Sequence, residues 1–515
     1  MDTLNSLAGG ILQVISSPFL LVLVIAGLLV GIIFGAIPGL SVVMAVILLL
    51  PFSYGLLVTP GILLLASAYY GGVFGGAISA ILLHIPGDSI HIPLLWESKG
   101  LLRKGLGAKA VGSSLYAATA GGLAGLLVLT FLGPQIAHVA LQFKSPEYFA
   151  VVFFGLTTVV ALGNVGGRKK RPLRVAFISL ALGLFIGTIG IDATFAVPRF
   201  TFNIPFLNGG IGFTVLMIGV YAIGEVIERF ATSFQGSGLT AHGRVRPPSF
   251  KEFRKLWPSL GRGVTIGSVI GMVPAAGATV AALVTYGVER QASKSGKLFG
   301  TGRLEGVVAP QSAASATVGG ALTPLLTLGI PGSASDAVIL GAFLLKGIQP
   351  GPGLFTHQHA LVYAMIGALF LCMAFMLILT FIFTPLFLKA LTAPQSIVAA
   401  LVTIFALVGA YAIHNSFNDV IIALVFGILG YAMRRYDYPI APLVLGVILG
   451  PIAEKSFVTS LSSTGDPFIF FKQPIALGFI ILAFLALSVP LWQALLRRRH
   501  QRTPPEMKGS SYEQE

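Results

Sequence analysis

Long apolar runs separated by short polar loops dominate this chain. The clearest runs, each near the ~20 residues that a helix needs to cross a bilayer, are Pro18–Ile37, Gly107–Leu132, Glu147–Leu162, Leu361–Leu388 and Pro474–Leu496. With the other apolar stretches they fit about ten to twelve crossings. The pattern predicts an all-α polytopic membrane protein embedded in a lipid bilayer. No basic segment precedes the first run and no small-residue cleavage site follows it, so we interpret it as a retained helix.

Composition excludes a soluble protein. The chain has 515 residues, of which 55% are hydrophobic and 10% charged, and its mean hydropathy is +0.90. The net charge of +15 does not indicate nucleic-acid binding, because the basic residues lie in short loops between apolar segments. Cys372 is the only cysteine, which rules out disulfides and multi-cysteine metal sites.

The basic residues predict the topology. They cluster at Lys99–Lys109, Arg168–Arg174, Arg244–Arg262, Arg434–Arg435 and Arg497–Arg499. Because loops rich in Lys and Arg stay on the cytoplasmic side, we place all five clusters there. The amino terminus is then periplasmic and the carboxy terminus cytoplasmic.

Two ordered sequence matches indicate an internal repeat. The pattern G-x-x-x-G-x-x-P runs from Gly31 to Pro38 and again from Gly267 to Pro274, and GGAISAILLHIPG (75–87) resembles GGALTPLLTLGIPG (319–332). We divide the chain into a first membrane repeat (1–250), a second membrane repeat (251–473) and an extra carboxy-terminal helix with a polar cytoplasmic tail (474–515).

Loop charges predict that the second repeat is inverted relative to the first. The basic Lys99–Lys109 loop corresponds to a stretch with only Lys346, and the basic Arg168–Arg174 loop corresponds to His414–Asp419, which has no Lys or Arg. Conversely, the sparsely charged Asp192–Asn203 loop corresponds to Arg434–Arg435. Loops on the same side would share a charge bias, so these reversals favour inverted-topology repeats with broken helices or re-entrant hairpins, as in many secondary transporters.

Four Pro-containing helix breaks occupy two pairs of matching positions. We call Ile37–Ser41 the first break, Ile85–Ser89 the second, Val273–Thr279 the third and Ile330–Ser335 the fourth. Free backbone groups in a membrane are tolerated only against protein or a wet cavity, and interrupted segments in matching positions point to a substrate site. Because a half-helix that starts there aims N–H groups and a positive dipole at the site, we predict an anionic substrate. The predicted substrate-binding residues are Pro38, Gly39, Ser41, Pro86, Gly87, Ser89, Pro274, Gly277, Thr279, Pro331, Gly332, Ser333 and Ser335.

Two acidic residues lie beside these breaks. Asp88 and Asp336 are each a candidate proton or cation site if the side chain faces the cavity, and each is equally compatible with a loop position. The small-residue face Gly27-x-x-x-Gly31-x-x-x-Gly35 is more typical of close helix packing than of a site.

No complete catalytic set is present. Gly87-Asp88-Ser89-Ile90 superficially resembles a lipase nucleophile block, and His84 and His91 lie near it. The matching segment of the repeat has no histidine, however, and the chain carries no H-E-x-x-H, G-x-S-x-G or nucleotide fingerprint. We therefore expect no enzymatic activity.

Several motifs together resemble the large membrane subunit (TctA) of the tripartite tricarboxylate transporter family over nearly the whole chain. They are GAIPGLS (35–41), YGGVFGG (70–76) with IPG (85–87), SPEY (145–148), GID (190–192) with PRFTF (198–202), and LGIPGS (328–333) with GIQPGP (347–352). The resemblance implies a periplasmic solute-binding protein (TctC-like) that delivers an organic carboxylate, and a small integral membrane subunit (TctB-like).

The chain also departs from the family pattern. QSAASA (311–316) stands where the family typically has E-A-A-N-N-A, PAAGA (274–278) stands for P-G-A-G-A, and ESKG (97–100) stands for D-G-Y-P. The first departure removes a carboxylate and two amide ligands, so we expect weaker Na⁺ dependence, with protons substituting through Asp88 or Asp336. Gln311 and Ser315 remain candidate coupling residues.

We therefore predict cation-gradient-coupled uptake of a dicarboxylate or tricarboxylate across the bacterial inner membrane. Na⁺ or H⁺ is the coupling ion, and we expect no other cofactor or metal. The alternative is a passive channel or facilitator for small anions. The sequence does not identify the carboxylate.

Overall fold

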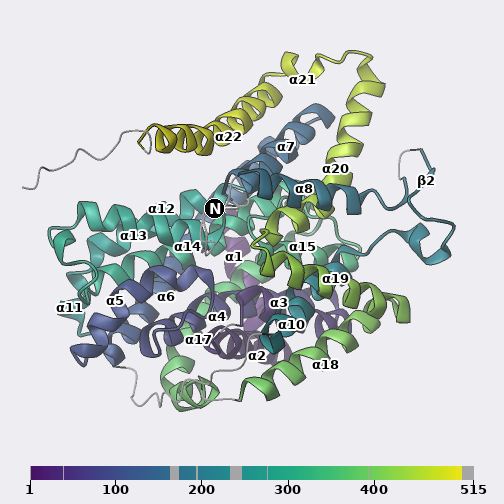
Figure 1. Ribbon diagram of the computed structural model, residues 1–515. Coiled ribbons are helices and arrows are strands. Elements are labelled where there is room, and N and C mark those ends of the chain that lie inside the picture. Colours follow the sequence, from purple (N-terminus) through teal and green to yellow (C-terminus); the bar gives the residue numbers. More distant parts are fainter. Residues whose placement is uncertain are drawn as a thin grey trace, which may run out of the picture.

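The computed structural model describes residues 2–38, 40–162, 173–192, 195–231, 246–274, 276–391 and 394–500. Most of this part of the chain is helical (Figure 1). The elements of the first half are α1 (Asp2–Ile15), α2 (Pro18–Ala36), α3 (Val42–Tyr54), α4 (Val58–Leu82), η1 (Ser89–His91), α5 (Ile92–Arg103), α6 (Gly107–Ala140), α7 (Ser145–Leu162), α8 (Leu173–Gly187), β1 (Gly190–Ile191), β2 (Pro198–Arg199), η2 (Pro205–Gly209), α9 (Phe213–Met217), η3 (Ile218–Ile223) and α10 (Gly224–Ala231).

The described part of the second half is also built from helices. Its elements are α11 (Phe250–Arg254), α12 (Trp257–Met272), α13 (Gly277–Ala292), η4 (Gly296–Leu298), α14 (Glu305–Leu328), α15 (Ala334–Leu345), α16 (Leu354–His357), α17 (His359–Leu391), α18 (Gln395–His414), α19 (Phe417–Arg435), α20 (Ile440–Thr464), α21 (Ile469–Lys472) and α22 (Pro474–His500).

The predicted all-α polytopic membrane fold is confirmed. In the described ranges, eight helices are long and apolar enough to cross a membrane: α2, α4, α6, α7, most of α17 and α18, α19 and α20. Five shorter apolar helices of 10–17 residues accompany them: Thr3–Ile15, Val42–Tyr54, Leu173–Gly187, Ala334–Leu345 and Pro474–Ser488. The predicted number of crossings lies between the eight long helices and the larger set that includes the shorter ones.

The first apolar run is not the first helix. It forms α2, and a separate helix, α1, precedes it and packs on α17, where a Cβ added to Gly10 would lie 2.0 Å from the Tyr363 carbonyl oxygen. Since α1 is short and carries polar residues, hydropathy over a membrane-length window did not predict it.

Glycine stripes pack the two halves in the same way. A Cβ on Gly27, Gly31 or Gly35 of α2 would lie 2.1–2.4 Å from backbone oxygens of α4, namely those of Leu64, Ala68 and Gly72. In the second half, Cβ atoms on Gly263, Gly267 and Gly271 of α12 would lie 2.3–2.7 Å from backbone oxygens of α14, namely those of Ala309, Ala313 and Thr317. Such contact requires small residues, so the interpretation of the first stripe as packing is correct and the second half repeats it. The inverted orientation and the boundaries at 250 and 473 stay predictions.

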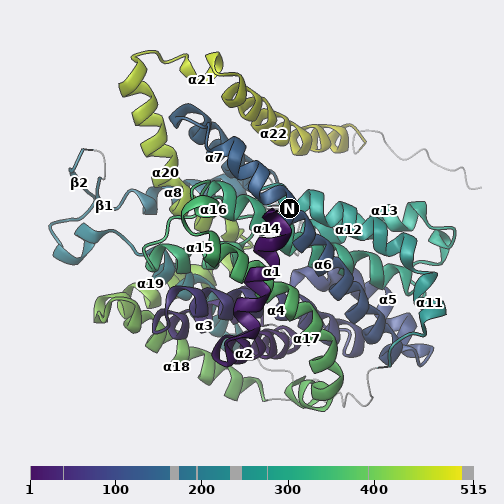
Figure 2. The same ribbon diagram turned by 180° about the vertical axis from the view of Figure 1, so that it is seen from behind.

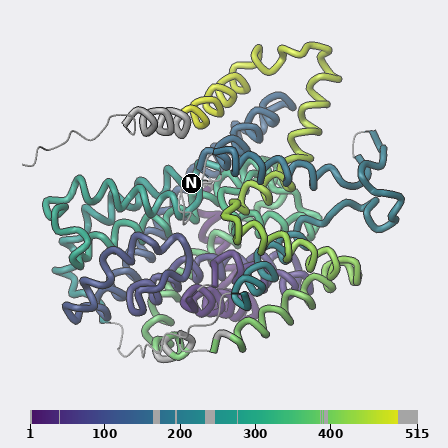
Figure 3. Tube along the Cα trace, viewed as in Figure 1, coloured from purple at the N-terminus to yellow at the C-terminus, as the bar shows by residue number. Residues whose placement is uncertain are grey.

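The molecule has two distinguishable ends. Figures 1 and 2 show α11 at one end and the β1–β2 hairpin projecting at the other. In the hairpin Gly190 pairs with Arg199 and Ile191 with Pro198, and the Arg199 side chain forms ion pairs with Asp192 and Glu454. Figure 3 follows the chain into a carboxy-terminal arm, where α22 packs on α7.

The α11 end gathers two of the predicted cytoplasmic basic clusters. Lys109 at the start of α6 pairs with Glu252 of α11, and the Arg246 N–H donates to the Ala108 carbonyl at 3.2 Å. Hydrogen bonds from Lys109 and Ser249 lower the pKa of Glu252 to about 2. The contact agrees with placing both clusters on one side. Most of the Arg168–Arg174 cluster, Arg244 and the polar tail after His500 lie outside the described residues.

Candidate site at the four helix breaks

A helix ends at every predicted break. At the first break α2 ends at Ala36 and α3 begins at Val42, and at the second α4 ends at Leu82 and η1 begins at Ser89. At the third α12 ends at Met272 and α13 begins at Gly277, and at the fourth α14 ends at Leu328 and α15 begins at Ala334. The predicted residue Gly39 lies outside the described residues.

Side chains at the second break connect it to the first and third breaks. The Val42 N–H at the start of α3 donates to Asp88 Oδ2 at 3.2 Å. The Ser89 and Thr279 hydroxyls are 3.1 Å apart. The start of α3, the start of η1 and the start of α13 therefore meet at one place.

The third and fourth breaks also lie close together. A Cβ added to Gly277 would lie 3.9 Å from both the Gly332 carbonyl oxygen and the Ser333 Cβ. All four breaks thus form one continuous cluster, although they lie far apart in the sequence. We call this cluster the break junction.

Several polar side chains of the junction keep part of their surface accessible. Ser41, Asp88, Ser89, Thr279 and Ser333 are all partly exposed. Ser335 and Asp336, by contrast, are buried. The partly exposed polar side chains of the junction are thus four hydroxyl groups and one carboxylate.

The start of α3 already holds a carboxylate. The Ser41 hydroxyl accepts from the Met44 N–H, while Asp88 Oδ2 accepts from the Val42 N–H. Asp88 Oδ1 also accepts from the Ser89 N–H, so one side chain caps two helix starts. An acidic cap at a helix start satisfies N–H groups and complements the helix dipole.

The start of α13 differs from the start of α3. Within the described chain, no side chain caps α13, whose preceding residue is Ala276. Gly277 has a φ of +65°, which permits the sharp entry into the helix. This first turn lies close to Ser89 and Ser333, and its N–H groups have no side-chain cap from Ala276.

The fourth break contains a buried acid. The Ser333 hydroxyl caps α15 by accepting from the Asp336 N–H at 3.3 Å and donates to Asp336 Oδ2 at 2.6 Å. The Tyr69 hydroxyl of α4 lies 3.1 Å from the Ser333 Oγ and 3.5 Å from Asp336 Oδ2. Asp336 is 0% exposed, and its Oδ1 has no hydrogen-bond partner in the described part of the chain.

The sequence profile of the tripartite tricarboxylate transporter TctA family matches residues 21–445, a range that contains all four breaks. The chain belongs to the TctA family. It is therefore a multi-pass membrane protein and a component of a tripartite tricarboxylate transporter.

Two relatives from Agrobacterium vitis are similar to this TctA-family chain. An uncharacterized 52.8 kDa protein in the TAR-I ttuC' 3' region is 31% identical over 500 residues, covering 97% of this chain and 98% of the relative. An uncharacterized protein in the TAR-II ttuC' 3' region is 37% identical over 236 residues, covering 46% of this chain and 98% of the relative. No solved structure matches the chain.

The glycines that follow the prolines in this TctA-family junction serve packing. Gly87 and Gly332 are buried, and a Cβ on Gly87 would lie 2.3 Å from the Gly35 carbonyl oxygen. A Cβ on Gly332 would lie 2.6 Å from the Ala321 Cβ. Neither glycine has a positive φ, so the exposed contact surface lies on the residues after them. The matching prolines Pro274 and Pro331 are buried as well, whereas Pro38 and Pro86 are partly exposed.

Two further candidates lie inside α14. Gln311 is 0% exposed, and its Nε2 donates to the Val73 carbonyl at 3.2 Å and faces the Ser315 Oγ at 3.4 Å. His91 Nε2 lies 2.9 Å from the same Val73 carbonyl oxygen. Gln311 is thus connected to α4 beside the second break.

Sequence reasoning missed two side chains at the junction. Tyr69 contacts Ser333 and Asp336, and Arg229 of α10 approaches the Pro38 carbonyl oxygen with its Nη2 at 3.5 Å. Tyr69 lies directly before the YGGVFGG motif, but its apolar surroundings gave no polar signal. Arg229 follows from no local pattern, because the contact joins residues far apart in the chain.

Proposed function

We propose that this protein is the permease subunit of a binding-protein-dependent transporter that takes up an organic dicarboxylate or tricarboxylate across the bacterial inner membrane. In this proposal a TctC-like periplasmic solute-binding protein delivers the substrate and a TctB-like small integral membrane subunit accompanies the permease. Family membership supports the assembly. The meeting of all four breaks at one junction supports the location of the site, and it is the observation on which the proposal rests.

The substrate carboxylate binds at the start of α13 in this proposal. Helix starts favour anions because their N–H groups lack helical partners and carry the positive end of the dipole. Asp88 already occupies the start of α3, whereas the start of α13 has no side-chain cap in the described chain. The Thr279 hydroxyl supplies a further donor in the same first turn, whereas the Ser89 and Ser333 hydroxyls already donate to Asp88 and Asp336.

Asp336 carries the coupling proton in this proposal. A buried carboxylate without a paired cation favours its protonated form or a bound cation. In the described chain the Asp336 carboxylate accepts hydrogen bonds from the Tyr69 and Ser333 hydroxyls and has no cationic partner. Asp88 is a weaker candidate, because both of its oxygens accept from backbone N–H groups. Protonation of Asp336 near the substrate site would connect carboxylate binding to proton entry.

The test is uptake of labelled succinate and citrate by right-side-out membrane vesicles that contain all three proposed components. Vesicles are given a proton gradient, a Na⁺ gradient or neither. Accumulation above the external concentration with a proton gradient alone is the expected result. Equilibration without accumulation under every gradient would indicate a passive facilitator, and recovery of chemically altered label would indicate an enzyme. Strict Na⁺ dependence would contradict the assignment of Asp336 as a proton site.

A further inference from the structure

Helices α5 and α15, which follow the second and fourth breaks, end in the same way. Each has a lysine at its C-cap, Lys104 in α5 and Lys346 in α15, followed by a glycine with positive φ, +68° at Gly105 and +71° at Gly347. In both cases the next N–H returns to a carbonyl in the last turn at 2.9 Å, from Leu106 to Leu101 and from Ile348 to Phe343. This is the Schellman ending, which the glycine makes possible. The repeat therefore extends to these two helix ends.

Each C-cap lysine reaches into the opposite half of the protein. Lys104 Nζ donates to the Gly302 carbonyl at 3.3 Å, in the loop between α13 and α14. Lys346 Nζ donates to the Leu56 carbonyl at 2.6 Å, in the loop between α3 and α4. These two loops hold corresponding positions, since each follows the half-helix that starts at a break. Both contacts hence join a half-helix of one repeat to a loop of the other.

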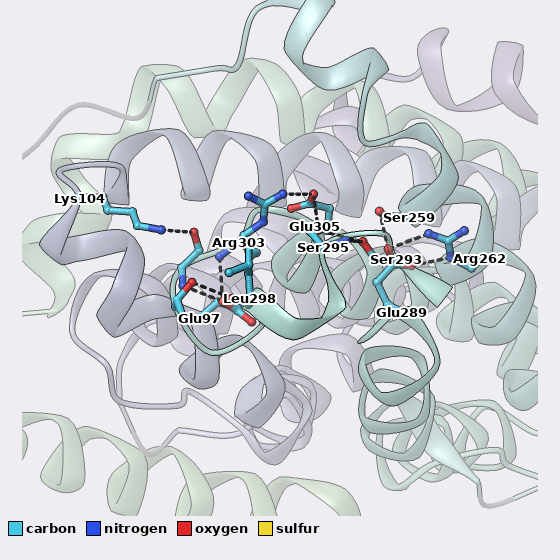
Figure 4. A network of polar contacts seen from close by, with 12 residues as sticks. Glu97, Lys104, Ser259, Arg262, Glu289, Ser293, Ser295, Leu298, Arg303 and Glu305 are labelled. Carbon is cyan, nitrogen blue, oxygen red and sulfur yellow. Dashed lines mark hydrogen bonds and ion pairs between the residues drawn. The ribbon is translucent and has the colours of Figure 1, made fainter. Parts of the chain in front are cut away.

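The α5 contact contains an additional buried carboxylate, Glu97. Its Oε1 accepts from the Gly300 N–H at 2.7 Å and the Tyr286 hydroxyl at 2.8 Å. Its Oε2 accepts from the Gly302 N–H at 2.9 Å and the Arg303 N–H at 2.8 Å. Figure 4 shows Glu97 and Lys104 converging on this loop. Glu97 is 0% exposed, so four donors compensate a fully buried charge.

The α15 contact lacks such a carboxylate. The residue of α15 that corresponds to Glu97 of α5 is Ile339, counted back from the C-cap lysine of each helix. Ile339 is buried and apolar. Lys346 itself lies against Gly61, where a Cβ would be 2.9 Å from the Lys346 Cε. The two contacts thus share a lysine and differ in one buried charge.

The two contacts lie toward opposite ends of the molecule. The α5 contact is close in sequence to Lys109, which pairs with Glu252 of α11. The α15 contact involves the end of α3, where Pro51 touches Gly409 near the α18–α19 turn, and His414 of that turn approaches Gly212 after the hairpin segment. Figures 1 and 2 show α11 and the hairpin at opposite ends.

We propose that these contacts are two latches: the α5 latch (Glu97 and Lys104 on the α13–α14 loop) and the α15 latch (Lys346 on the α3–α4 loop), which open alternately to expose the break junction to one side at a time. The inference rests on the proposed transport function. Both latches are closed in this structure. Alternating access needs a contact that breaks on each side while the site stays in place, and each latch joins a half-helix at the junction to the opposite repeat. Glu97, Lys104 and Lys346 are positioning residues in this scheme.

The test measures access to the junction from each side. A Ser89→Cys reporter is labelled with a membrane-impermeant maleimide in inside-out and right-side-out vesicles, with the complete transporter present. Buried Cys372 stays in the parent chain as the unlabelled background. We expect Glu97→Gln to raise labelling from the α11 side by about threefold to tenfold and to lower it from the other side, because charge-assisted hydrogen bonds are lost. Lys346→Met should do the opposite.

Three further variants keep the result interpretable. Tyr286→Phe removes one donor to Glu97 and should shift labelling in the same direction as Glu97→Gln but less, which covers the case that Glu97→Gln does not fold. Glu305→Gln changes the same polar network without touching Glu97, and Lys472→Met removes a surface lysine paired with Asp466. Neither control should change the ratio of labelling between the two sides.

Opposite shifts for the two latches support the proposal, because a loss of folded protein alone would lower labelling from both sides together. Shifts in the same direction, or an unchanged ratio in Tyr286→Phe and Lys346→Met, overturn it. Labelling does not depend on the identity of the substrate, so the latches can fail while carboxylate uptake stands. Opposite shifts in vesicles that accumulate no carboxylate would instead reject the proposed substrate.

Discussion

The start of α3 and the start of α13 hold corresponding positions in the two halves, but their polar neighbours differ. At α3 the Asp88 carboxylate accepts from the Val42 N–H. At α13 the residue that corresponds to Asp88 is Ser333 of the fourth break. A Cβ added to Gly277 would lie 3.9 Å from the Ser333 Cβ. One helix start thus has an anion of the protein's own, and the other has a neutral hydroxyl beside it.

The acidic residue of the second half lies one helical turn further along than that of the first half. Asp88 corresponds in position to Ser333, and His91 corresponds to Asp336. Asp88 is partly exposed and its oxygens accept from backbone N–H groups, while Asp336 is fully buried with one oxygen unpartnered in the described chain. In the proposed function the two halves therefore have different tasks: the first half holds a structural anion, and the second half binds the substrate anion beside the coupling acid.

The largest effect is expected for the glycine packing that the two halves share. Gly31→Val and Gly267→Val should each leave little folded protein, because the added Cβ would lie 2.1 Å from the Ala68 oxygen and 2.3 Å from the Ala313 oxygen. Overpacking of this kind costs roughly 3 kcal/mol or more. The measurement is the yield of monodisperse protein in detergent. Gly287→Val in α13, where a Cβ meets nothing within 4 Å, is the control, and normal yield for Gly267→Val would contradict the repeated packing.

The fold was largely predictable because its signals are local. Apolar length gave most of the spans, and Pro with Gly placed the breaks at the observed helix ends, since proline interrupts the helical hydrogen bonds wherever it lies. The stripe of Gly27, Gly31 and Gly35 predicted close packing. The family motifs, each weak alone, also pointed to the family that the profile match confirms.

The division of tasks at the site was not predictable from local pattern. Asp88 and Asp336 look alike in sequence, and only contacts across the chain, to Val42 and Tyr69 respectively, distinguish them. The glycines of the second and fourth breaks were predicted as substrate-binding residues, and the structure adds that an added Cβ at either would lie against a neighbouring helix. Glu97 stood out only as a departure from a family motif, since its donors lie some two hundred residues away.

The next effect concerns the uncapped helix start. Thr279→Asp places a carboxylate in the first turn of α13, as Asp88 does for α3, and an acid there is compatible with the helix. Repulsion of a substrate carboxylate at 4 Å amounts to about 4 kcal/mol for an effective dielectric constant of 20, or about a thousandfold weaker binding. Uptake in vesicles should thus be lost while the protein stays folded.

The matched control is Thr279→Asn, which has nearly the same size without the charge and should retain most of the uptake. Equal uptake by the Asp and Asn variants would remove the start of α13 from the proposed site.

A smaller effect is expected for coupling. Asp336→Asn keeps a side chain of the same shape but cannot release a proton, so gradient-driven accumulation should fall at least about tenfold while exchange of labelled for unlabelled substrate continues. Asp419→Asn changes another largely buried aspartate, paired with His414, and should accumulate substrate normally. Proton-driven accumulation by Asp336→Asn at the parental level would exclude Asp336 as the coupling acid.

The smallest effect is expected for Asp88. Asn is as good a helix cap as Asp, so Asp88→Asn should keep the bond from the Ser89 N–H and lower stability by no more than about 1 kcal/mol. Uptake should change by less than about fivefold, since the charge acts on α3 and not on the substrate.

Asp88→Ala removes both cap bonds and should lower the free energy of unfolding further, by about 0.5–2 kcal/mol in total. Uptake per folded molecule should not fall further than in Asp88→Asn. The comparison is decided by uptake normalised to folded protein in both variants. If Asp88→Asn abolished accumulation while Asp336→Asn did not, the first half would hold the coupling acid and the assignment of the two tasks would be reversed.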